Sequence, residues 1–160
     1  MPRVAHSGVF KWTISRRDRV NWTLCRYIMP TLEELENDVW GAPEFDSRLV
    51  TTCHKLRKKP IDDFTIEELR IMIGENIGLQ FFVPRAVSVL ERNPLAEGDN
   101  YPGDLLNAVT IADSSFFERS PLIVDRVTVV AKMAIDQLDS STDDSHLIQN
   151  FQRFINKYLK

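Results

Sequence analysis

Apolar residues recur at helical spacing through most of the chain after Met29. They fall three or four residues apart within 66–90, 123–138 and 147–158. This spacing gathers them on one face of a helix, which a soluble domain buries. The β-branched residues of 122–130 also admit a strand. As a whole, the pattern predicts a predominantly all-α fold, a single-domain bundle of about six helices.

Two capping boxes mark where helices begin. Thr31 is followed three residues later by Glu34, and Thr65 by Glu68, so that hydroxyl and carboxylate can each accept a hydrogen bond from a backbone N–H that would otherwise lack a partner. Ser47 and the Ser120-Pro121 pair are expected to start two further helices. The inner face of the helix after Ser47 carries Leu49, Cys53 and Leu56.

The long apolar pattern of 66–90 is interrupted by residues that weaken helices. Gly74 and Gly78 each cost about 1 kcal/mol relative to alanine in a helix interior, and Pro84 is tolerated in a first turn or at a kink. These residues predict two consecutive helices with a break within 76–80, or one kinked helix. The two glycines are also expected to allow close helix packing.

Charge divides the chain at Met29. Residues 1–28 hold six basic side chains and one acidic side chain, a net charge of +5, whereas the remainder holds 14 basic and 22 acidic side chains, a net charge of −8. Apolar residues alternate with polar ones in 10–14 and 20–24, which would suit a β-hairpin. The other interpretation is a leader outside the native domain. We therefore predict a basic segment over 1–28 and an acidic helical domain over 29–160.

Nothing in the chain indicates export or membrane insertion. The N-terminal segment lacks the continuous apolar core of a secretory signal, and no stretch is long enough for a membrane-spanning helix. Two cysteines, Cys25 and Cys53, are too few for a disulfide framework. We expect a cytoplasmic protein with both cysteines reduced.

Catalytic and metal-binding signatures are absent from the sequence. It contains no GxGxxG, GxxxxGK[ST], HExxH or GxSxG motif and no CxxC pair. Cys53 and His54 are adjacent, so they point about 100° apart on a helix and cannot readily act as nucleophile and base. The acidic pairs 62–63 and 67–68 flank Thr65, where a helix start attracts carboxylates. We predict no catalytic residues, no metal and no cofactor.

The basic run Lys55, Arg57, Lys58 and Lys59 has two interpretations. It could hold nucleic acid, but the net charge of −8 after residue 28 repels phosphate. Cations also suit a helix C-terminus, and we predict a solvated helix end. The segment 97–104, in contrast, has turn-forming residues at nearly every position and is the most distinctive loop.

Six blocks of the sequence resemble the immunity proteins of bacterial contact-dependent growth inhibition systems, the CdiI type. They are TLEELE from Thr31, LVTTCHKLRKKP from Leu49, TIEELRIMIGENIGL from Thr65, Val83-Pro84, Asn93-Pro94-Leu95, and EGDNYPGDLL from Glu97. The blocks fall within residues 31–109. The segment after Val109 resembles the family only in being helical, so that partner specificity is expected there. Residues 1–28 have no counterpart.

The resemblance implies a protein that is not an enzyme. It implies cytoplasmic binding and neutralisation of the C-terminal toxin domain of a cognate cell-surface CdiA protein. An acidic inhibitor fits a basic nuclease, which we expect to be masked stoichiometrically. We expect no direct contact with nucleic acid or membrane. The predicted toxin-binding residues are Glu97, Asp99, Tyr101, Asp104, Asp136, Asp139, Asp143 and Asp144.

Two other functions stay open on the sequence alone. One is a helical regulator that binds nucleic acid through residues 1–28 and the basic run. The other is a small hydrolase whose site is assembled from scattered carboxylates.

Overall fold

The computed structural model describes residues 29–44, 47–138 and 144–159. These residues contain eight α-helices, one short 3₁₀ helix and no strand. The elements are α1 Leu32–Glu36, α2 Arg48–Arg57, η1 Ile61–Asp63, α3 Ile66–Gly74, α4 Leu79–Leu90, α5 Asp104–Ile111, α6 Ser114–Glu118, α7 Pro121–Gln137 and α8 Ser145–Tyr158. The all-α prediction is confirmed, and residues 122–130 are helical. The predicted hairpin within 1–28 lies outside the described residues.

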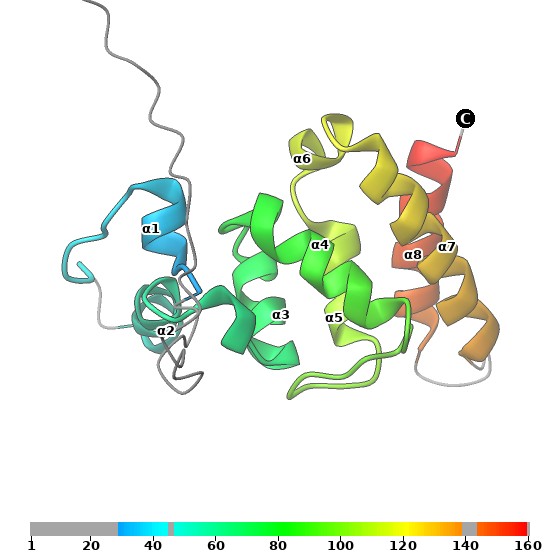
Figure 1. The fold of residues 1–160 in the computed structure, drawn as a ribbon. Coiled ribbons are helices and arrows are strands. Elements are labelled where there is room, and N and C mark those ends of the chain that lie inside the picture. The colour runs from blue at the N-terminus through cyan, green and yellow to red at the C-terminus, as the bar shows by residue number, and fades with distance from the viewer. Residues whose placement is uncertain (1–28, 45–46, 139–143, 160) are drawn as a thin grey trace, which may run out of the picture.

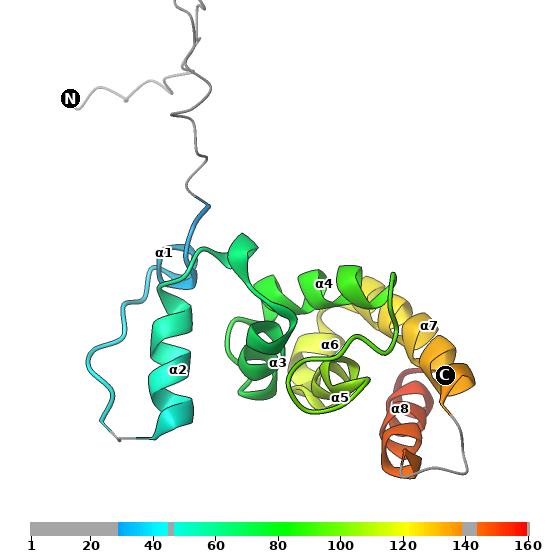
Figure 2. The ribbon, with the colours of Figure 1, turned by 90° about the horizontal axis from the view of Figure 1, so that it is seen from below.

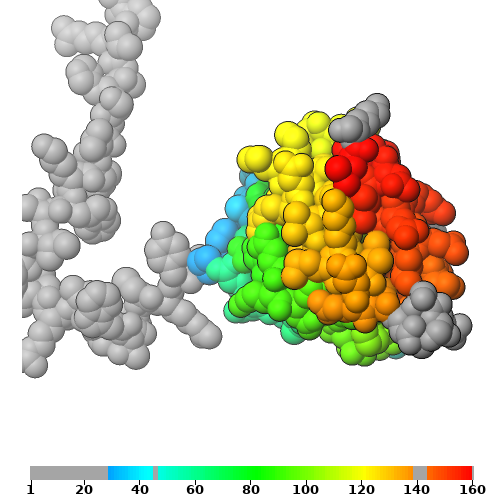
Figure 3. Space-filling model, turned by 90° about the vertical axis from the view of Figure 1, so that its right-hand side faces the viewer, coloured from blue at the N-terminus to red at the C-terminus, as the bar shows by residue number. Residues whose placement is uncertain are grey.

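The helices form two layers (Figures 1 and 2). In one layer α2, α3, α5 and α8 follow one another from the N-terminal to the C-terminal side of the molecule. Helices α4 and α7 run across this row, and α4 contacts α3, α5 and α7 while α7 also contacts α8. Figure 3 shows that the outer surface formed by α4, α7 and α8 is continuous. Within the described residues, no helix is long and apolar enough to cross a membrane.

Helix α5 lies at the centre of the fold. Leu105, Leu106 and Val109 are fully buried where α5 contacts α3, α4 and α8. Phe82 from α4 and Phe151 from α8 are buried in the same hydrophobic core. This burial stabilises the bundle because apolar side chains of this size each contribute about 1.5–3 kcal/mol when removed from water.

Both predicted capping boxes are present. At α1 the Thr31 hydroxyl accepts a hydrogen bond from the Glu34 backbone N–H, and the Glu34 carboxylate accepts one from the Thr31 backbone N–H. Thr65 and Glu68 make the same pair of hydrogen bonds at α3. Ser47 occupies the predicted position before α2, although its side chain makes no capping hydrogen bond. These starts are predictable from sequence because every partner lies within three residues.

The predicted break between α3 and α4 is confirmed. Asn76 and Gly78 both have positive φ, at 57° and 60°, and turn the chain between the helices. A Cβ on Gly78 would meet Leu32 and Phe82 side-chain atoms at 2.9 Å, so glycine also allows α1 to approach closely. The predicted close packing is wrong for Gly74, because a Cβ on this residue would meet no atom of another element within 4 Å.

One helix was not predicted and one further expectation needs correction. Helix α6 spans only Ser114–Glu118, which is too short to show a helical period in the sequence. Leu49, predicted on the inner face of α2, is 42% exposed, while Cys53 and Leu56 are buried as predicted.

The basic end of α2 is not the solvated surface that we predicted. Arg57 is 1% exposed, and its Nη1 donates to the Glu36 carboxylate at 2.6 Å. Lys59 donates to both carboxylate oxygens of Glu68, at 2.8 and 2.6 Å. The prediction is wrong for these two cations because their partners belong to α1 and α3, which the local charge pattern does not show. Lys55 and Lys58 are exposed.

Candidate functional site

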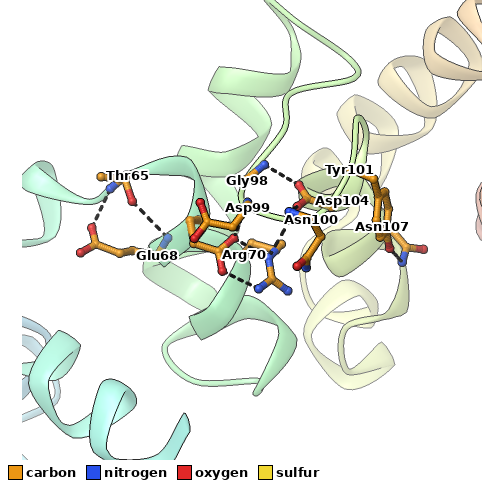
Figure 4. Close-up of polar contacts among 10 residues, drawn as sticks. Thr65, Glu68, Arg70, Gly98, Asp99, Asn100, Tyr101, Asp104 and Asn107 are labelled. Atoms are coloured by element: carbon orange, nitrogen blue, oxygen red, sulfur yellow. Dashed lines mark hydrogen bonds and ion pairs between the residues drawn. The ribbon is translucent and has the colours of Figure 1, made fainter. Parts of the chain in front are cut away.

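The loop 97–104 is held by the first residue of the helix that follows it. The Asp104 side chain is nearly fully buried, with the whole residue 2% exposed. Its two carboxylate oxygens accept hydrogen bonds from the backbone N–H groups of Gly98, at 2.7 Å, and Asn100, at 3.2 Å (Figure 4). A carboxylate with several backbone donors is strongly fixed, so the backbone of the loop has a defined conformation.

Helix α3 holds the same loop from the other side. Glu67 Oε2 accepts from the Asp99 backbone N–H at 3.0 Å and from Arg70 Nε at 2.7 Å, while Glu67 Oε1 accepts from Arg70 Nη2 at 2.6 Å. Arg70 Nε also lies 3.7 Å from Asp104 Oδ2. One guanidinium therefore lies between carboxylates of α3 and α5, and we call this group the Glu67–Arg70–Asp104 clamp.

The clamp has the expected electrostatic signature. The hydrogen bonds from Arg70 lower the pKa of the Glu67 carboxyl, against the opposing effect of its partial burial. The hydrogen bonds to Glu67 raise the pKa of Arg70, with a further contribution from Asp104. Both groups are therefore charged throughout the neutral range.

Gly98 fits the space between the two carboxylates. A Cβ at this position would lie 2.4 Å from Glu67 Oε2, 3.0 Å from Asp104 Oδ2 and 3.3 Å from the Glu67 Cα. Glu67 cannot move aside freely, because its oxygens are held by Arg70 and by the Asp99 amide. A residue without a side chain is thus required at this point of the loop.

The structure brings four of the predicted site residues together in this loop. Glu97 and Asp99 are exposed, and their side chains make no hydrogen bond or ion pair with the described part of the chain. Tyr101 is half-buried, and its hydroxyl accepts from Asn107 Nδ2 at 3.0 Å. Asp104, in contrast, offers almost no surface to a partner and acts on the loop from inside.

The other predicted residues lie at the ends of α7 and α8. Asp136 is exposed on the last turn of α7, and Asp144 precedes α8. The Tyr101 ring packs edge-on against His146, with centroids 6.1 Å apart, so the loop and the start of α8 are neighbours. Asp139 and Asp143 lie outside the described residues.

Negative charge is concentrated in the part of the chain that contains this loop. Residues 61–104 hold nine acidic and three basic side chains, a net charge of −6. Residues 29–60 and 105–160 each have a net charge of only −1. Three-quarters of the net charge of −8 after residue 28 therefore comes from residues 61–104, which contain η1, α3, α4 and the loop 97–104.

Cavities and potential metal ligands also occur among the described residues outside this loop. A cavity of about 400 Å³ lies between α5, α6 and α8, but its lining contains neither histidine nor cysteine. The described residues include no cluster of three or more potential metal ligands. Burial raises the pKa of the Cys53 thiol, and the neighbouring His54 ring packs edge-on against Trp40 at 5.0 Å.

The alternatives left open by the sequence find little support in these residues. Of the four cations in the basic run 55–59, Arg57 and Lys59 are engaged by carboxylates, which leaves two for phosphate contacts. Among the acidic pairs near Thr65, Asp62 pairs with Arg85, while Glu67 and Glu68 pair with Arg70 and Lys59.

Sequence reasoning missed Glu67 and Arg70 as part of the site. Their spacing of three residues does indicate an ion pair on one helix face. The contact that matters joins Glu67 to the Asp99 amide, 32 residues away. No periodic signal in the sequence reports such a contact.

Fold and site define an acidic, all-helical protein whose most distinctive surface is a fixed loop with two free carboxylates. The family model of CDI immunity proteins matches residues 34–127, more than half of the chain. The chain therefore belongs to the family of immunity proteins of contact-dependent growth inhibition. No curated protein and no solved structure matches it.

Family membership establishes the general role. The protein is a toxin-neutralising immunity protein, and such proteins bind a cognate CdiA toxin and are generally not enzymes. The match includes the whole loop 97–104 and its clamp. It also extends beyond Val109, further toward the C-terminus than the sequence resemblance indicated.

Proposed function

We propose that this immunity protein neutralises a nuclease toxin by stoichiometric masking, with Glu97 and Asp99 facing a basic surface of the toxin domain. The observation that carries the proposal is the concentration of negative charge, a net −6, in residues 61–104, the part of the chain that contains a loop with two free carboxylates. Inhibition then needs no bond-making chemistry, only an interface that occupies or covers the nuclease site.

Electrostatics gives the physical reason. A nuclease surface that binds phosphate is positive, and a complementary acidic surface both steers association and disfavours other partners. A fixed loop presents its carboxylates with little loss of conformational freedom on binding. Tyr101 adds contact area next to them, and an aromatic side chain is well suited to this role.

Asp136 and Asp144 belong to the proposed interface as its outer part. The contact between Tyr101 and His146 places the start of α8 beside the loop. Asp139 and Asp143 connect these positions along the chain and complete the acidic group of the proposal.

The test is a pair of charge reversals in the full chain, Glu97→Lys with Asp99→Lys. The matched control is Glu44→Lys with Glu75→Lys, which changes the charge equally at exposed positions outside the loop. Binding is measured to the C-terminal toxin domain of the CdiA protein encoded beside this chain, over a series of salt concentrations. We expect the loop variant to associate about tenfold more slowly at low salt, and the deficit to shrink as salt screens the charges.

The same variants are compared for protection of growing cells against the toxin. Unchanged association and protection in the folded loop variant would move the interface to the group around Asp136 and Asp144. Titration of toxin activity tests masking directly: complete inhibition at one equivalent supports it, whereas turnover of many toxin molecules by one inhibitor contradicts it.

We further propose that residues 29–160 are the working domain. The support is the charge reversal at Met29 and a family match that starts at residue 34. Deletion of residues 1–28 is expected to leave the thermal unfolding midpoint and toxin binding unchanged. A large loss of stability would show instead that Phe10, Trp12 and Trp22 contribute to the core.

A further inference from the structure

We infer that Arg70 is a positioning residue for toxin recognition, which holds the loop 97–104 in its binding conformation without touching the toxin. This inference rests on the proposed role of the loop. Arg70 fixes Glu67, and Glu67 in turn holds the Asp99 backbone, so that one group of three side chains, partly or fully buried, fixes the backbone that carries the two free carboxylates.

The geometry connects Arg70 to the three restrained backbone amides in the first half of the loop, those of Gly98, Asp99 and Asn100. The guanidinium donates twice to Glu67, and its Nε lies 3.7 Å from the carboxylate of Asp104. The Asp104 carboxylate accepts hydrogen bonds from the backbone N–H groups of Gly98 and Asn100, and the Glu67 carboxylate accepts one from that of Asp99. Without Arg70, two acidic groups would lie together with no cation between them, and their repulsion would favour opening of the loop.

The clamp side chains are poorly placed to bind a partner directly. The side chains of Glu67, Arg70 and Asp104 are 19%, 24% and 1% exposed. Glu97 and Asp99 are exposed on the loop itself. Arg70 therefore acts through the loop, and a looser loop binds more weakly in proportion to the fraction of molecules that keep the competent conformation.

The direction in which toxin affinity changes after a single substitution distinguishes a positioning role of Arg70 from an effect of its charge. Arg70→Met removes a cation and makes residues 61–104 more negative, which by electrostatics alone would tighten binding to a basic toxin. Positioning predicts the opposite. Arg92→Met is the matched control, because it removes the same charge from the same segment at an exposed side chain outside the clamp. Arg70→Lys keeps the charge but lacks the planar fork that bridges two groups.

The experiment measures two quantities on the full chain and these three variants. Amide hydrogen exchange at Gly98, Asp99 and Asn100 reports the loop without any toxin. Affinity for the CdiA toxin domain reports recognition. We expect faster exchange at all three amides in Arg70→Met, with binding at least tenfold weaker, an intermediate effect in Arg70→Lys, and unchanged or tighter binding in Arg92→Met.

Two results would overturn the inference. One is equal exchange at the three amides in the parent chain and in every Arg70 variant that folds, which would show that Arg70 does not hold the loop. The other is faster amide exchange in Arg70→Met combined with toxin binding as tight as in the parent chain. In that second case the charge reversal of Glu97 and Asp99 decides separately whether the loop is the interface, so failure of the positioning role and failure of the proposed function remain distinct. The Arg70→Lys variant keeps the test valid if Arg70→Met does not fold.

Discussion

Replacement of Arg57 by methionine should destabilise the protein substantially, although a cation in a lysine-rich helix end is usually a tolerant position. Arg57 is 1% exposed and lies over the Trp40 ring with its Cζ 4.1 Å from the centroid. Nη1 donates to Glu36 at 2.6 Å and Nη2 to the Asp38 carbonyl at 2.8 Å. These contacts attach residues 36–40 to α2.

The expected decrease in the free energy of unfolding follows from the contacts that the Arg57 guanidinium makes and from the groups that lose their partner when it is removed. Two charge-assisted hydrogen bonds contribute about 1.5–3 kcal/mol each, and a partly desolvated cation–π contact about 1 kcal/mol. The Glu36 side chain keeps 24% exposure, so water partly replaces its partner. Arg57 Nε is buried without a hydrogen-bond partner, and its removal relieves that defect. The net loss is about 3 kcal/mol.

Thermal and urea unfolding measure this loss. A decrease of about 3 kcal/mol corresponds to an unfolding midpoint lower by about 10 °C for a domain of this size. Lys55→Met is the control, because it removes the same charge from an exposed position of the same helix and should change stability by less than about 0.5 kcal/mol. Equal stability of the two variants would refute the conclusion that Arg57 anchors residues 36–40.

Three further outcomes are expected from the same structure. Gly98→Ala should speed amide exchange in the loop and weaken toxin binding, since its Cβ would lie 2.4 Å from Glu67 Oε2; unchanged exchange would contradict the close approach. Glu67→Gln should make the free energy of unfolding fall less steeply as the pH is lowered. The pKa of Glu67 in the folded protein is below the ordinary 4.5, so its stabilising contribution is present above pH 4.5 and is lost as the pH falls through the lower folded pKa. Thermal unfolding midpoints of both proteins between about pH 5 and 3 measure this difference. In a Cys25→Ser background, Cys53 should react slowly with iodoacetamide near neutral pH because burial raises its pKa and limits access; rapid labelling of the folded protein would argue against this.

The parts of the fold that sequence predicted are those with local causes. Capping boxes at Thr31 and Thr65, and the break at Gly78, depend on residues within a few positions of one another. Helix α6 was missed although Asp113 caps it by accepting from the Ser115 amide, because five residues give no measurable period. Arg57 was misinterpreted because its partner Glu36 lies 21 residues earlier.

The candidate site shows the same division. The sequence identified the loop 97–104 from its turn-forming residues, and the structure places Glu97 and Asp99 on its surface. Asp104 carries the same charge but is buried, and only the three-dimensional contacts with Gly98 and Asn100 reveal that it holds the loop. A carboxylate at a surface loop and one that restrains the loop have the same appearance in a sequence.

The residues beyond the family match cannot be a separate specificity appendage. The match ends at residue 127, within α7, yet Val130 and Ala134 of α7 and Phe151 and Phe154 of α8 are buried in the same core as the matched helices. These inner faces are constrained by packing, because core substitutions that change volume destabilise a domain by several kcal/mol. The outer faces are not so constrained: Val129 and Met133 are 58% and 42% exposed along α7. Side chains there are free to change without disturbing the core, so any tuning of partner choice in this part of the chain must lie on the outer surface that Figure 3 shows.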